Sequence, residues 1–226
     1  MMTDALTRHK WRQKMRRVKS TLNIMPLAAC SAIMALSIST LAYGAGVKPK
    51  TQGLSAQIQS IAKPVASEFK SISAKSLING ANISLNMRLS GNSIKVKENN
   101  GCSWTRHADW FAPSSGWAKC GVSKNWHTGS ATVNLLNSLY PIKVGSTGSY
   151  KRSAVSHTGK KYTRTTRCKV TGAVEVISGK KVTPAFVVVC NDTSRKRTTW
   201  YAPGIGPVAY TEVHHKNGLE EAWVRK

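Results

Sequence analysis

Apolar and polar residues alternate along most of the chain beyond residue 81, which is the pattern of strands with one buried face. In residues 83–89 the odd positions are apolar and the even positions are polar. Gly91-Asn92 then matches a two-residue hairpin turn, and Ile94 and Val96 continue the same apolar face. This stretch predicts an antiparallel hairpin.

The C-terminal part of the chain has the same organisation. Asn217-Gly218 is typical of a type I′ turn and separates two strand-like stretches, Val208–His214 and Leu219–Val224. Residues 141–148 contain the Pro and Gly of a corner, and residues 133–136 fit either a strand or a helix. Strands separated by turns predict a mainly β fold, either a curled antiparallel sheet or a sandwich or half-barrel, stapled by disulfides.

Residues 54–78 have a different spacing, with apolar residues three or four positions apart. This spacing predicts helices over 54–61 and 64–78, and Pro64 suits the first turn of the second helix. Residues 45–53 indicate a flexible leader. The expected organisation is therefore a leader and helical segment over 45–80 and a single disulfide-bonded antiparallel β domain over 81–226.

The first 44 residues have the three parts of a secretory signal peptide. Basic residues dominate positions 1–21, an apolar run covers 24–42, and small residues surround a cleavage point before Ala45. Three alternatives are an uncleaved membrane anchor, a lipoprotein box at Cys30 and a twin-arginine signal at Arg16-Arg17. A cleaved signal places the protein in the periplasm or outside the cell, with no membrane span after processing.

Four cysteines follow the predicted signal, and an even number in an exported chain indicates disulfides. Two alternating stretches fold as a hairpin about Ser178-Gly179-Lys180. This fold brings Cys168 opposite Cys190 and puts every apolar residue of the hairpin on one face. Cys102 and Cys120 then pair by elimination. No pair has the Cys-x-x-Cys spacing of a zinc site, so no metal is expected.

Basic residues greatly outnumber acidic ones. The 226 residues include 34 Lys+Arg and 9 Asp+Glu, a formal net charge of +25, and +19 remains once the predicted signal is removed. Hydrophobic residues make up 41%, which is enough for a packed core and excludes a disordered chain. Such a charge attracts phosphate-rich partners, either nucleic acid or an anionic component of the cell envelope.

The basic residues are concentrated in two stretches that the predicted hairpin brings together. The candidate anion-binding residues are Lys160, Lys161, Arg164, Arg167, Arg195, Lys196 and Arg197. By alternation, Arg167 lies on the face of the hairpin away from the cysteines, whereas Arg164 shares the cysteine face. We expect the solvent face and one end of the sheet to form a basic patch. The alternative is a generic basic surface suited to an anionic envelope.

Catalytic motifs are not recognisable in the chain. It has no Gly-x-Ser-x-Gly elbow, phosphate-binding loop, His-Glu-x-x-His or dinucleotide fingerprint. His107 and Asp109 share one face of a predicted strand but lack a third partner. We expect His214 and His215 to face Glu221 and Glu220 across the last hairpin, as surface pairs. No catalytic residue, cofactor or metal ligand is therefore assigned.

Four tryptophans, Trp104, Trp110, Trp117 and Trp126, fall within 23 residues and have basic residues between them. Tryptophans interleaved with bases can stack on nucleobases or sugars. The more ordinary use of such residues is to fill a core and its corners.

Two seven-residue segments, Trp110–Gly116 and Trp200–Gly206, share an aromatic pair followed by Ala-Pro-x-x-Gly. Each predicts a strand that runs into a tight corner, because Pro fixes φ and Gly supplies a positive φ. The copies are either two related half-units, each with its own disulfide, or two corners that arose independently.

The second of these corners, together with Tyr140-Pro141-Ile142-Lys143-Val144-Gly145, resembles the corners of a group of exported bacterial proteins of mostly unassigned activity. The resemblance covers about residues 140–226. It implies a curled antiparallel sheet like that of envelope lipoprotein carriers and an exported location. The Cys102–Cys120 segment departs from the pattern of this group.

These observations favour an exported, non-catalytic envelope or secreted protein that binds an anionic ligand or surface. One alternative is a periplasmic carrier or chaperone that holds an apolar ligand in a curled sheet. Another is an enzyme that uses His107 or His127. A large apolar cavity would favour the carrier, a polar cleft containing both histidines and an acid would favour the enzyme, and a closed core with a basic face would favour the anion binder.

Overall fold

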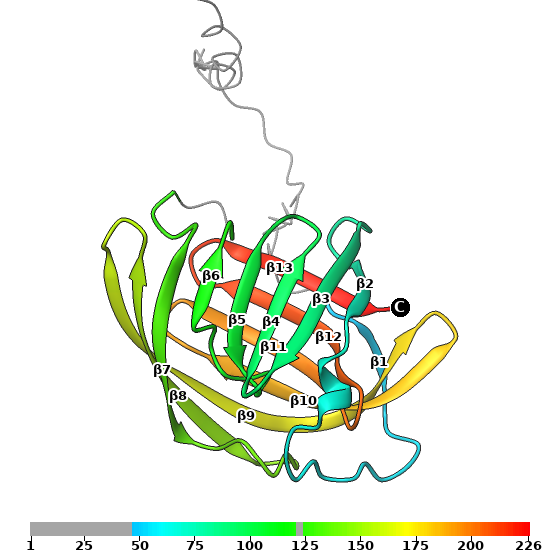
Figure 1. Ribbon diagram of the computed structural model, residues 1–226. Coiled ribbons are helices and arrows are strands. Elements are labelled where there is room, and N and C mark those ends of the chain that lie inside the picture. The colour runs from blue at the N-terminus through cyan, green and yellow to red at the C-terminus, as the bar shows by residue number, and fades with distance from the viewer. Residues whose placement is uncertain (1–46, 121–123) are drawn as a thin grey trace, which may run out of the picture. The chain divides into compact units, whose positions relative to one another are not determined.

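The computed structural model describes residues 47–120 and 124–226 (Figure 1). The predicted signal peptide over 1–44, with Cys30 and Arg16-Arg17, lies outside the described residues. In the part of the chain that the structure does describe, no helix is long and apolar enough to cross a membrane.

Twelve antiparallel strands close into a barrel, because β8 pairs with β9 and β13 pairs with β2 (Figure 1). In chain order the barrel strands are β2 (Ile72–Ser76), β3 (Asn82–Ser90), β4 (Ser93–Glu98), β5 (Ser103–His107), β6 (Gly116–Ala118), β7 (Gly129–Asn137), β8 (Thr147–Ser156), β9 (Lys161–Ser178), β10 (Lys181–Asn191), β11 (Arg195–Ala202), β12 (Gly206–His214) and β13 (Gly218–Arg225). The short strand β1 (Lys50–Gln52) extends the sheet beside the second half of β9. The mainly β, antiparallel prediction is confirmed, and the curled sheet closes on itself.

The predicted N-terminal helices are wrong. Among the described residues before β3 only a single turn, η1 (Ala66–Phe69), is helical, and Ile72–Ser76 forms strand β2 between β13 and β3. Ile72, Ala74 and Ser76 are buried on one side of this strand, so the same residues also satisfy a period of two. The residues form a strand and not a helix because both neighbouring strands, β13 and β3, form hydrogen bonds with them. The β domain therefore begins before residue 81, and residues 50–52 of the predicted leader are strand.

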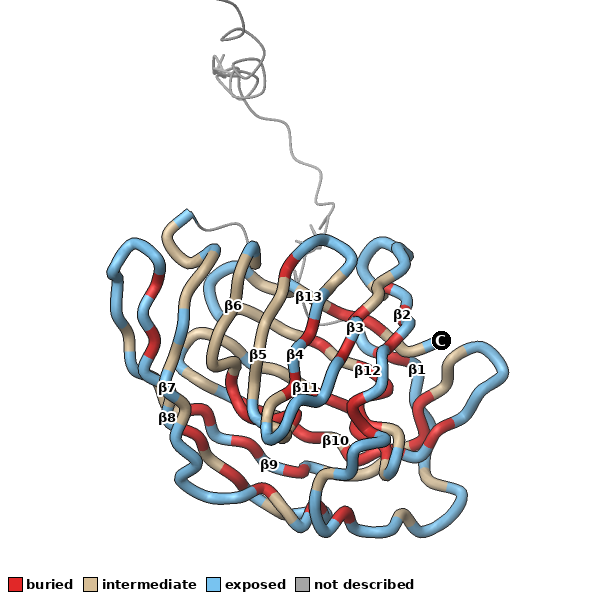
Figure 2. The backbone as a smooth tube through the Cα atoms, viewed as in Figure 1, coloured by how far each residue is buried: buried red, intermediate tan, exposed pale blue. Residues whose placement is uncertain are grey.

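The apolar core fills one half of the barrel interior. Ile94 and Leu85 from one wall face Val170, Phe186 and Val188 from the other, and all five are buried. Figure 2 shows these buried stretches on both walls of the barrel. Burying side chains of this size contributes about 1.5–3 kcal/mol each to stability.

Three segments plug the end of the barrel next to this core. They are η1, the corner that contains Trp110 and Phe111, and the corner that contains Leu139 and Ile142. The side chain of Glu68, buried in η1, accepts hydrogen bonds from the Tyr201 hydroxyl (2.9 Å) and from the backbone N–H of Gly204 (3.1 Å). These bonds join the plug to the β11–β12 corner.

The β9–β10 hairpin has the predicted register at its cysteines and a different one at its turn. Cys168 lies opposite Cys190, but a bulge between Val187 and Val188 shifts the pairing by one residue towards Gly179. Because a one-residue shift exchanges the two faces, the apolar residues do not share one face as predicted. The turn half of the hairpin instead has Val174, Val176 and Ala185 on the outer face, in a second apolar cluster with Trp200 and Ala209.

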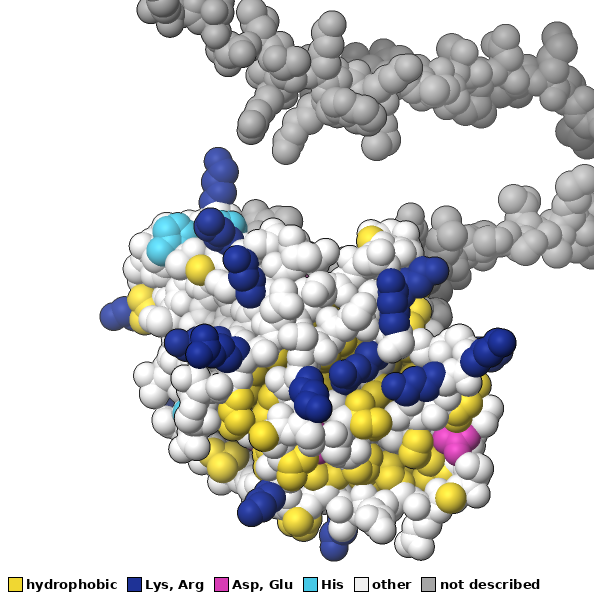
Figure 3. Space-filling view, turned by 45° about the vertical axis from the view of Figure 1, so that its right-hand side comes forward, with side chains coloured by type: hydrophobic (Ala, Val, Ile, Leu, Met, Phe, Trp, Pro, Cys, Tyr) yellow, Lys and Arg dark blue, Asp and Glu magenta, His cyan; other side chains and the backbone are white. Residues whose placement is uncertain are grey.

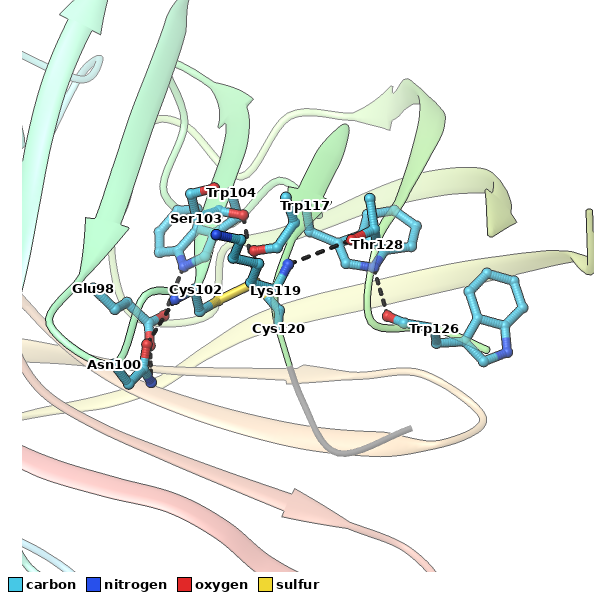
Figure 4. The surroundings of a disulfide bond; sticks show 11 residues. Glu98, Asn100, Cys102, Ser103, Trp104, Trp117, Lys119, Cys120, Trp126 and Thr128 are labelled. Atoms are coloured by element: carbon cyan, nitrogen blue, oxygen red, sulfur yellow. Dashed lines mark hydrogen bonds between the residues drawn. A yellow bond between two sulfur atoms is a disulfide. The ribbon is translucent and has the colours of Figure 1, made fainter. Parts of the chain in front are cut away.

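Both predicted disulfides are confirmed. Cys168 and Cys190 are joined across β9 and β10 with a Cα–Cα distance of 4.0 Å, and both are buried. Cys102 and Cys120 join the start of β5 to the segment after β6, with a Cα–Cα distance of 4.6 Å (Figure 4). The first bond lies in the barrel wall, and the second closes the loop that carries β5 and β6.

Of the two predicted two-residue turns, the first is confirmed and the second is wrong. Ser90 pairs with Ser93 around Gly91-Asn92, as expected. In the last hairpin, a bulge after Glu212 moves the register, so that β12 ends at His214 and β13 begins at Gly218. The predicted two-residue turn is therefore a three-residue loop over 215–217.

The corners of the internal repeat differ in form but lie together. The second corner follows strand β11 as predicted, whereas the first is a turn between β5 and β6 rather than the end of a strand. Phe111 and Tyr201, which are equivalent in the two copies, pack with their ring centroids 5.1 Å apart. The repeat thus brings two similar corners to the plugged end of the barrel.

Candidate functional site

The barrel interior also has a charged part, which we call the arginine end. Its defining residues are Arg106, Arg152, Arg164, Arg195 and Arg197. Arg197 pairs with Cys190 across β10 and β11, and Arg164 pairs with Arg152 across β8 and β9, so these side chains share the inner face. Arg164 lies on the cysteine face, as predicted, and its side chain reaches Ser194 beside Arg195. This face lines the barrel interior, so Arg164, Arg195 and Arg197 are not part of the same surface as Arg167. Arg197 lies opposite Cys190, and Arg164 lies on the same face of β9 as Cys168. The face that carries the disulfide is the inner face of the barrel.

Aromatic rings stack on the guanidinium groups of the arginine end. Arg106 lies 4.2 Å from the ring centroid of Trp104 and 4.8 Å from that of Trp110. Arg152 lies 4.5 Å from that of Trp117, and Arg164 lies 4.3 Å from that of Tyr162. Each such contact stabilises a partly desolvated cation.

The clustered tryptophans thus serve the barrel interior. Trp126 packs against Tyr162 with centroids 4.7 Å apart, and its carbonyl accepts a hydrogen bond from Nε1 of Trp117 at 2.8 Å (Figure 4). Nε1 of Trp104 donates to Glu98 at 2.8 Å. The alternation of Trp104 with Arg106 was a signal for a shared inner face that the sequence reading did not use.

Carboxylates also line the arginine end. Glu212 forms an ion pair with Arg195 (2.9 Å) and accepts a hydrogen bond from the Tyr210 hydroxyl (2.5 Å). Glu221 lies opposite Glu212 across β12 and β13 and accepts a hydrogen bond from Nε1 of Trp223 at 2.8 Å. The pKa of Glu221 is raised to about 8, mainly by burial and also by the neighbouring charges of Glu212 and Glu98. Glu221 is therefore mostly protonated at neutral pH.

Replacing Glu221 by glutamine should remove a pH dependence of folding. The carboxyl titrates near 4.5 in the unfolded chain and at about 8 in the folded one, so the folded state binds the proton more tightly. Stability contributed by this group is complete below pH 4.5 and is lost as the pH rises through about 8. Urea unfolding should find Glu221→Gln more stable than the wild type at pH 9, by at least about 1 kcal/mol, and not at pH 5.

The adjacent carboxylate provides the control for this prediction. Glu220 is exposed and pairs with Arg195 at 3.0 Å. Glu220→Gln should leave the shape of the stability–pH curve unchanged between pH 6 and 9. Parallel curves for Glu221→Gln and the wild type would contradict the assignment of a raised pKa to Glu221.

The remaining predicted anion-binding residues lie outside the barrel. Three of them, with two neighbouring lysines, form what we call the outer basic face; it comprises Lys151, Lys161, Arg167, Lys169 and Lys196. Asn191 of β10 lies between Arg167 of β9 and Lys196 of β11. Lys160 is exposed in the turn before β9. The seven predicted residues therefore divide between the inside of the barrel and its outer surface.

Charge is segregated between surface and interior throughout the described chain. Every lysine from Lys48 to Lys226 is exposed. The acidic residues are buried (Glu68, Glu175), half-buried (Glu98, Asp109, Asp192, Glu212, Glu221) or exposed (Glu220). On the face shown in Figure 3, basic side chains protrude widely and acidic ones show at few places. The net positive charge is therefore concentrated on the surface.

The side chains of His107 and Asp109 lie in different surroundings. His107 is exposed at the end of β5, whereas the carboxylate of Asp109 accepts hydrogen bonds from the Tyr150 hydroxyl (2.6 Å) and the Phe111 N–H (2.9 Å). The proposed His107–Asp109 pair is thus not formed. Within residues 47–120 and 124–226 no group of three His, Cys, Asp or Glu side chains could hold a metal ion.

The expected pairs of the C-terminal histidines are also wrong. Nδ1 of His214 accepts hydrogen bonds from the backbone N–H groups of Lys216 (3.1 Å) and Asn217 (3.3 Å). Nε2 of His215 lies 3.0 Å from the Asp192 carbonyl oxygen. The bulge after Glu212 is the reason, because it pairs His214 with Gly218 and leaves His215 in the loop.

The apolar half of the barrel is filled by its own side chains, which does not support the carrier hypothesis. A groove of about 500 Å³ lies outside the barrel, between residues 52–57 and the β9–β10 hairpin. Its lining includes Glu175, Val182 and Pro184. The groove is therefore mixed in polarity and separate from the apolar core.

The fold and the arginine end define a disulfide-bonded antiparallel β-barrel with a segregated charge distribution. Comparisons of the chain with protein-family models, with curated proteins and with solved structures found no match. The function must therefore be argued from the site itself.

Proposed function

We propose that the protein is an exported, non-catalytic binder of polyanions that uses its outer basic face. The observation that carries the proposal is the charge segregation, with every lysine exposed and seven of the eight described acidic residues buried or half-buried. A surface with almost no exposed carboxylates attracts phosphate- or sulfate-rich polymers, and release of their counterions favours binding. The two disulfides are consistent with an oxidising compartment.

The outer basic face suits such a ligand better than an isolated lysine does. Arg167 pairs with Ser149 on one side and with Asn191 on the other, and Lys151 pairs with Thr165. Polar, uncharged side chains therefore separate the cations and can donate hydrogen bonds to phosphate oxygens. The positive charges lie in a row across β8, β9 and β11, so that successive phosphates of a polyanion can each contact one of them.

Removing four charges from this face should weaken polyanion binding and reduce its dependence on salt. The variant combines Lys151→Gln, Arg167→Gln, Lys169→Gln and Lys196→Gln. Affinity for heparin, duplex DNA and lipopolysaccharide is measured by fluorescence anisotropy at low and physiological salt. The slope of log affinity against log salt should fall by up to about four, one for each lost phosphate contact. Thermal stability should change little, because exposed charges contribute little to folding.

A matched variant removes the same charge elsewhere. Lys75, Arg88, Lys95 and Lys97 are exposed on β2–β4, and their replacement by glutamine should leave most of the affinity intact. Equal losses in both variants would mean that binding depends on total charge, and the assignment to the outer basic face would be wrong. If the wild type binds no better than an unrelated protein of equal charge, the function itself is refuted.

A further inference from the structure

The arginine end holds cationic groups that the polyanion proposal does not use. Among the described residues, Arg106, Arg152 and Arg164 take part in no ion pair, whereas Arg195 and Arg197 pair with carboxylates. Nε of Arg106, of Arg152 and of Arg197 is buried and has no hydrogen-bond partner. A buried polar group without a partner is costly, and native proteins contain few of them.

Most of the donor capacity of these guanidinium groups is free. A guanidinium carries five N–H donors. Arg152 donates to the Tyr162 hydroxyl at 2.7 Å, Arg106 to the Trp110 carbonyl, and Arg197 only weakly to the Thr166 hydroxyl at 3.5 Å. Stacking on Trp104 and Trp117 occupies the faces of two of these groups, which leaves their N–H edges directed away from the rings.

The positive charge of Arg197 opposes those of Arg106 and Arg152. The pKa of Arg106 is lowered to about 10, mainly by burial and in part by the positive charge of Arg197. Burial also lowers the pKa of Arg152, with the same contribution from Arg197. Arg197 therefore lies within electrostatic reach of both. An anion among them would relieve this repulsion and satisfy the free donors together.

We propose that Arg106, Arg152 and Arg197 bind a small tetrahedral oxyanion of the phosphate class inside the arginine end of the barrel. Phosphate offers several oxygens in different directions, which suits guanidinium groups that come from β5, β8 and β11. A single carboxylate would satisfy one of them. The side chain of Arg195 is 43% exposed and is part of the same cluster, so the ligand reaches the site from that side.

Intrinsic tryptophan fluorescence tests the proposal directly, because Trp104, Trp110 and Trp117 stack on two of the binding arginines. The full chain is titrated with inorganic phosphate while sodium chloride keeps the ionic strength constant. A saturable change in emission and a rise in melting temperature are expected, since a ligand that binds the folded state stabilises it. Glycerol 3-phosphate in a second titration distinguishes free phosphate from the phosphate group of a larger ligand.

Two single variants locate the site. Arg152→Gln should weaken phosphate binding by about tenfold or more, because charged hydrogen bonds are lost. Arg167→Gln removes the same charge from the outer face of β9 and should leave the affinity unchanged within about twofold. If Arg152→Gln does not fold, the effect of phosphate on the melting temperature of the wild type still tests whether phosphate binds.

Three results would overturn the proposal: a response that sodium chloride reproduces, no response, or equal losses in the two variants. The outcome is separate from the polyanion test. The outer-face variant with four replacements should keep its phosphate response, because none of those residues is inside the barrel.

Discussion

Gly206→Ala is expected to destabilise the protein by about 2–5 kcal/mol, the sum of a backbone strain and a steric clash. Gly206 has φ +86°, a region in which an L side chain is strained. A Cβ there would lie 2.4 Å from the Glu68 carbonyl oxygen. Glu68 cannot move easily, because its side chain is bonded to the Tyr201 hydroxyl and to the Gly204 N–H. Urea unfolding measures the loss.

Gly204→Ala separates the two contributions. Gly204 also has a positive φ, +69°, but a Cβ there meets no atom within 4 Å. This control should lose only the cost of the left-handed conformation, about 1–2 kcal/mol. If both variants lose the same stability, the contact between η1 and the β11–β12 corner is not as tight as the structure shows.

Removing the Cys168–Cys190 bond is expected to cost about 2–5 kcal/mol. The double variant Cys168→Ala, Cys190→Ala opens a link between residues 22 apart in sequence. In the entropic account this frees the unfolded chain, and both cysteines are also buried in the barrel wall, so their replacement leaves space. The measurement is urea unfolding under non-reducing conditions.

The second disulfide is the matched control, because Cys102 and Cys120 are 18 residues apart and the entropic contribution is nearly the same. Cys120 is only half-buried, so Cys102→Ala, Cys120→Ala should cost less. A Cys168→Ala, Cys190→Ala variant within about 1 kcal/mol of the wild type would show that packing around the first bond compensates for its loss.

The local sequence was sufficient wherever one strand and its turn specify the partner. Gly91-Asn92 fixed the register of β3 and β4, because a two-residue turn leaves a single pairing. Alternation around Cys168 and Cys190 also predicted their disulfide, although the register at the turn of that hairpin differs by one residue. The antiparallel β class followed from repeated alternation and turns.

Bulges could not be read from alternation. A bulge leaves both strands apolar in alternate positions, but the strand with the extra residue exchanges its faces on one side of the bulge. The bulge opposite Val187 and Val188 moved Val174 and Val176 to the outer surface, and the one after Glu212 paired His214 with Gly218. Their positions depend on how the whole barrel curves, which no single strand encodes.

The sequence by itself determined the antiparallel strands, both disulfides and the large positive charge. Only the tertiary structure decided that the sheet closes, that residues 72–76 join it, and that Arg152, Arg164 and Arg197 point inward. The physical reason is that alternation tells which residues share a face, but the face that becomes the interior is set by which strands meet. Closure of β8 on β9 made the cysteine face, with its arginines, the interior of the barrel and left the lysines outside.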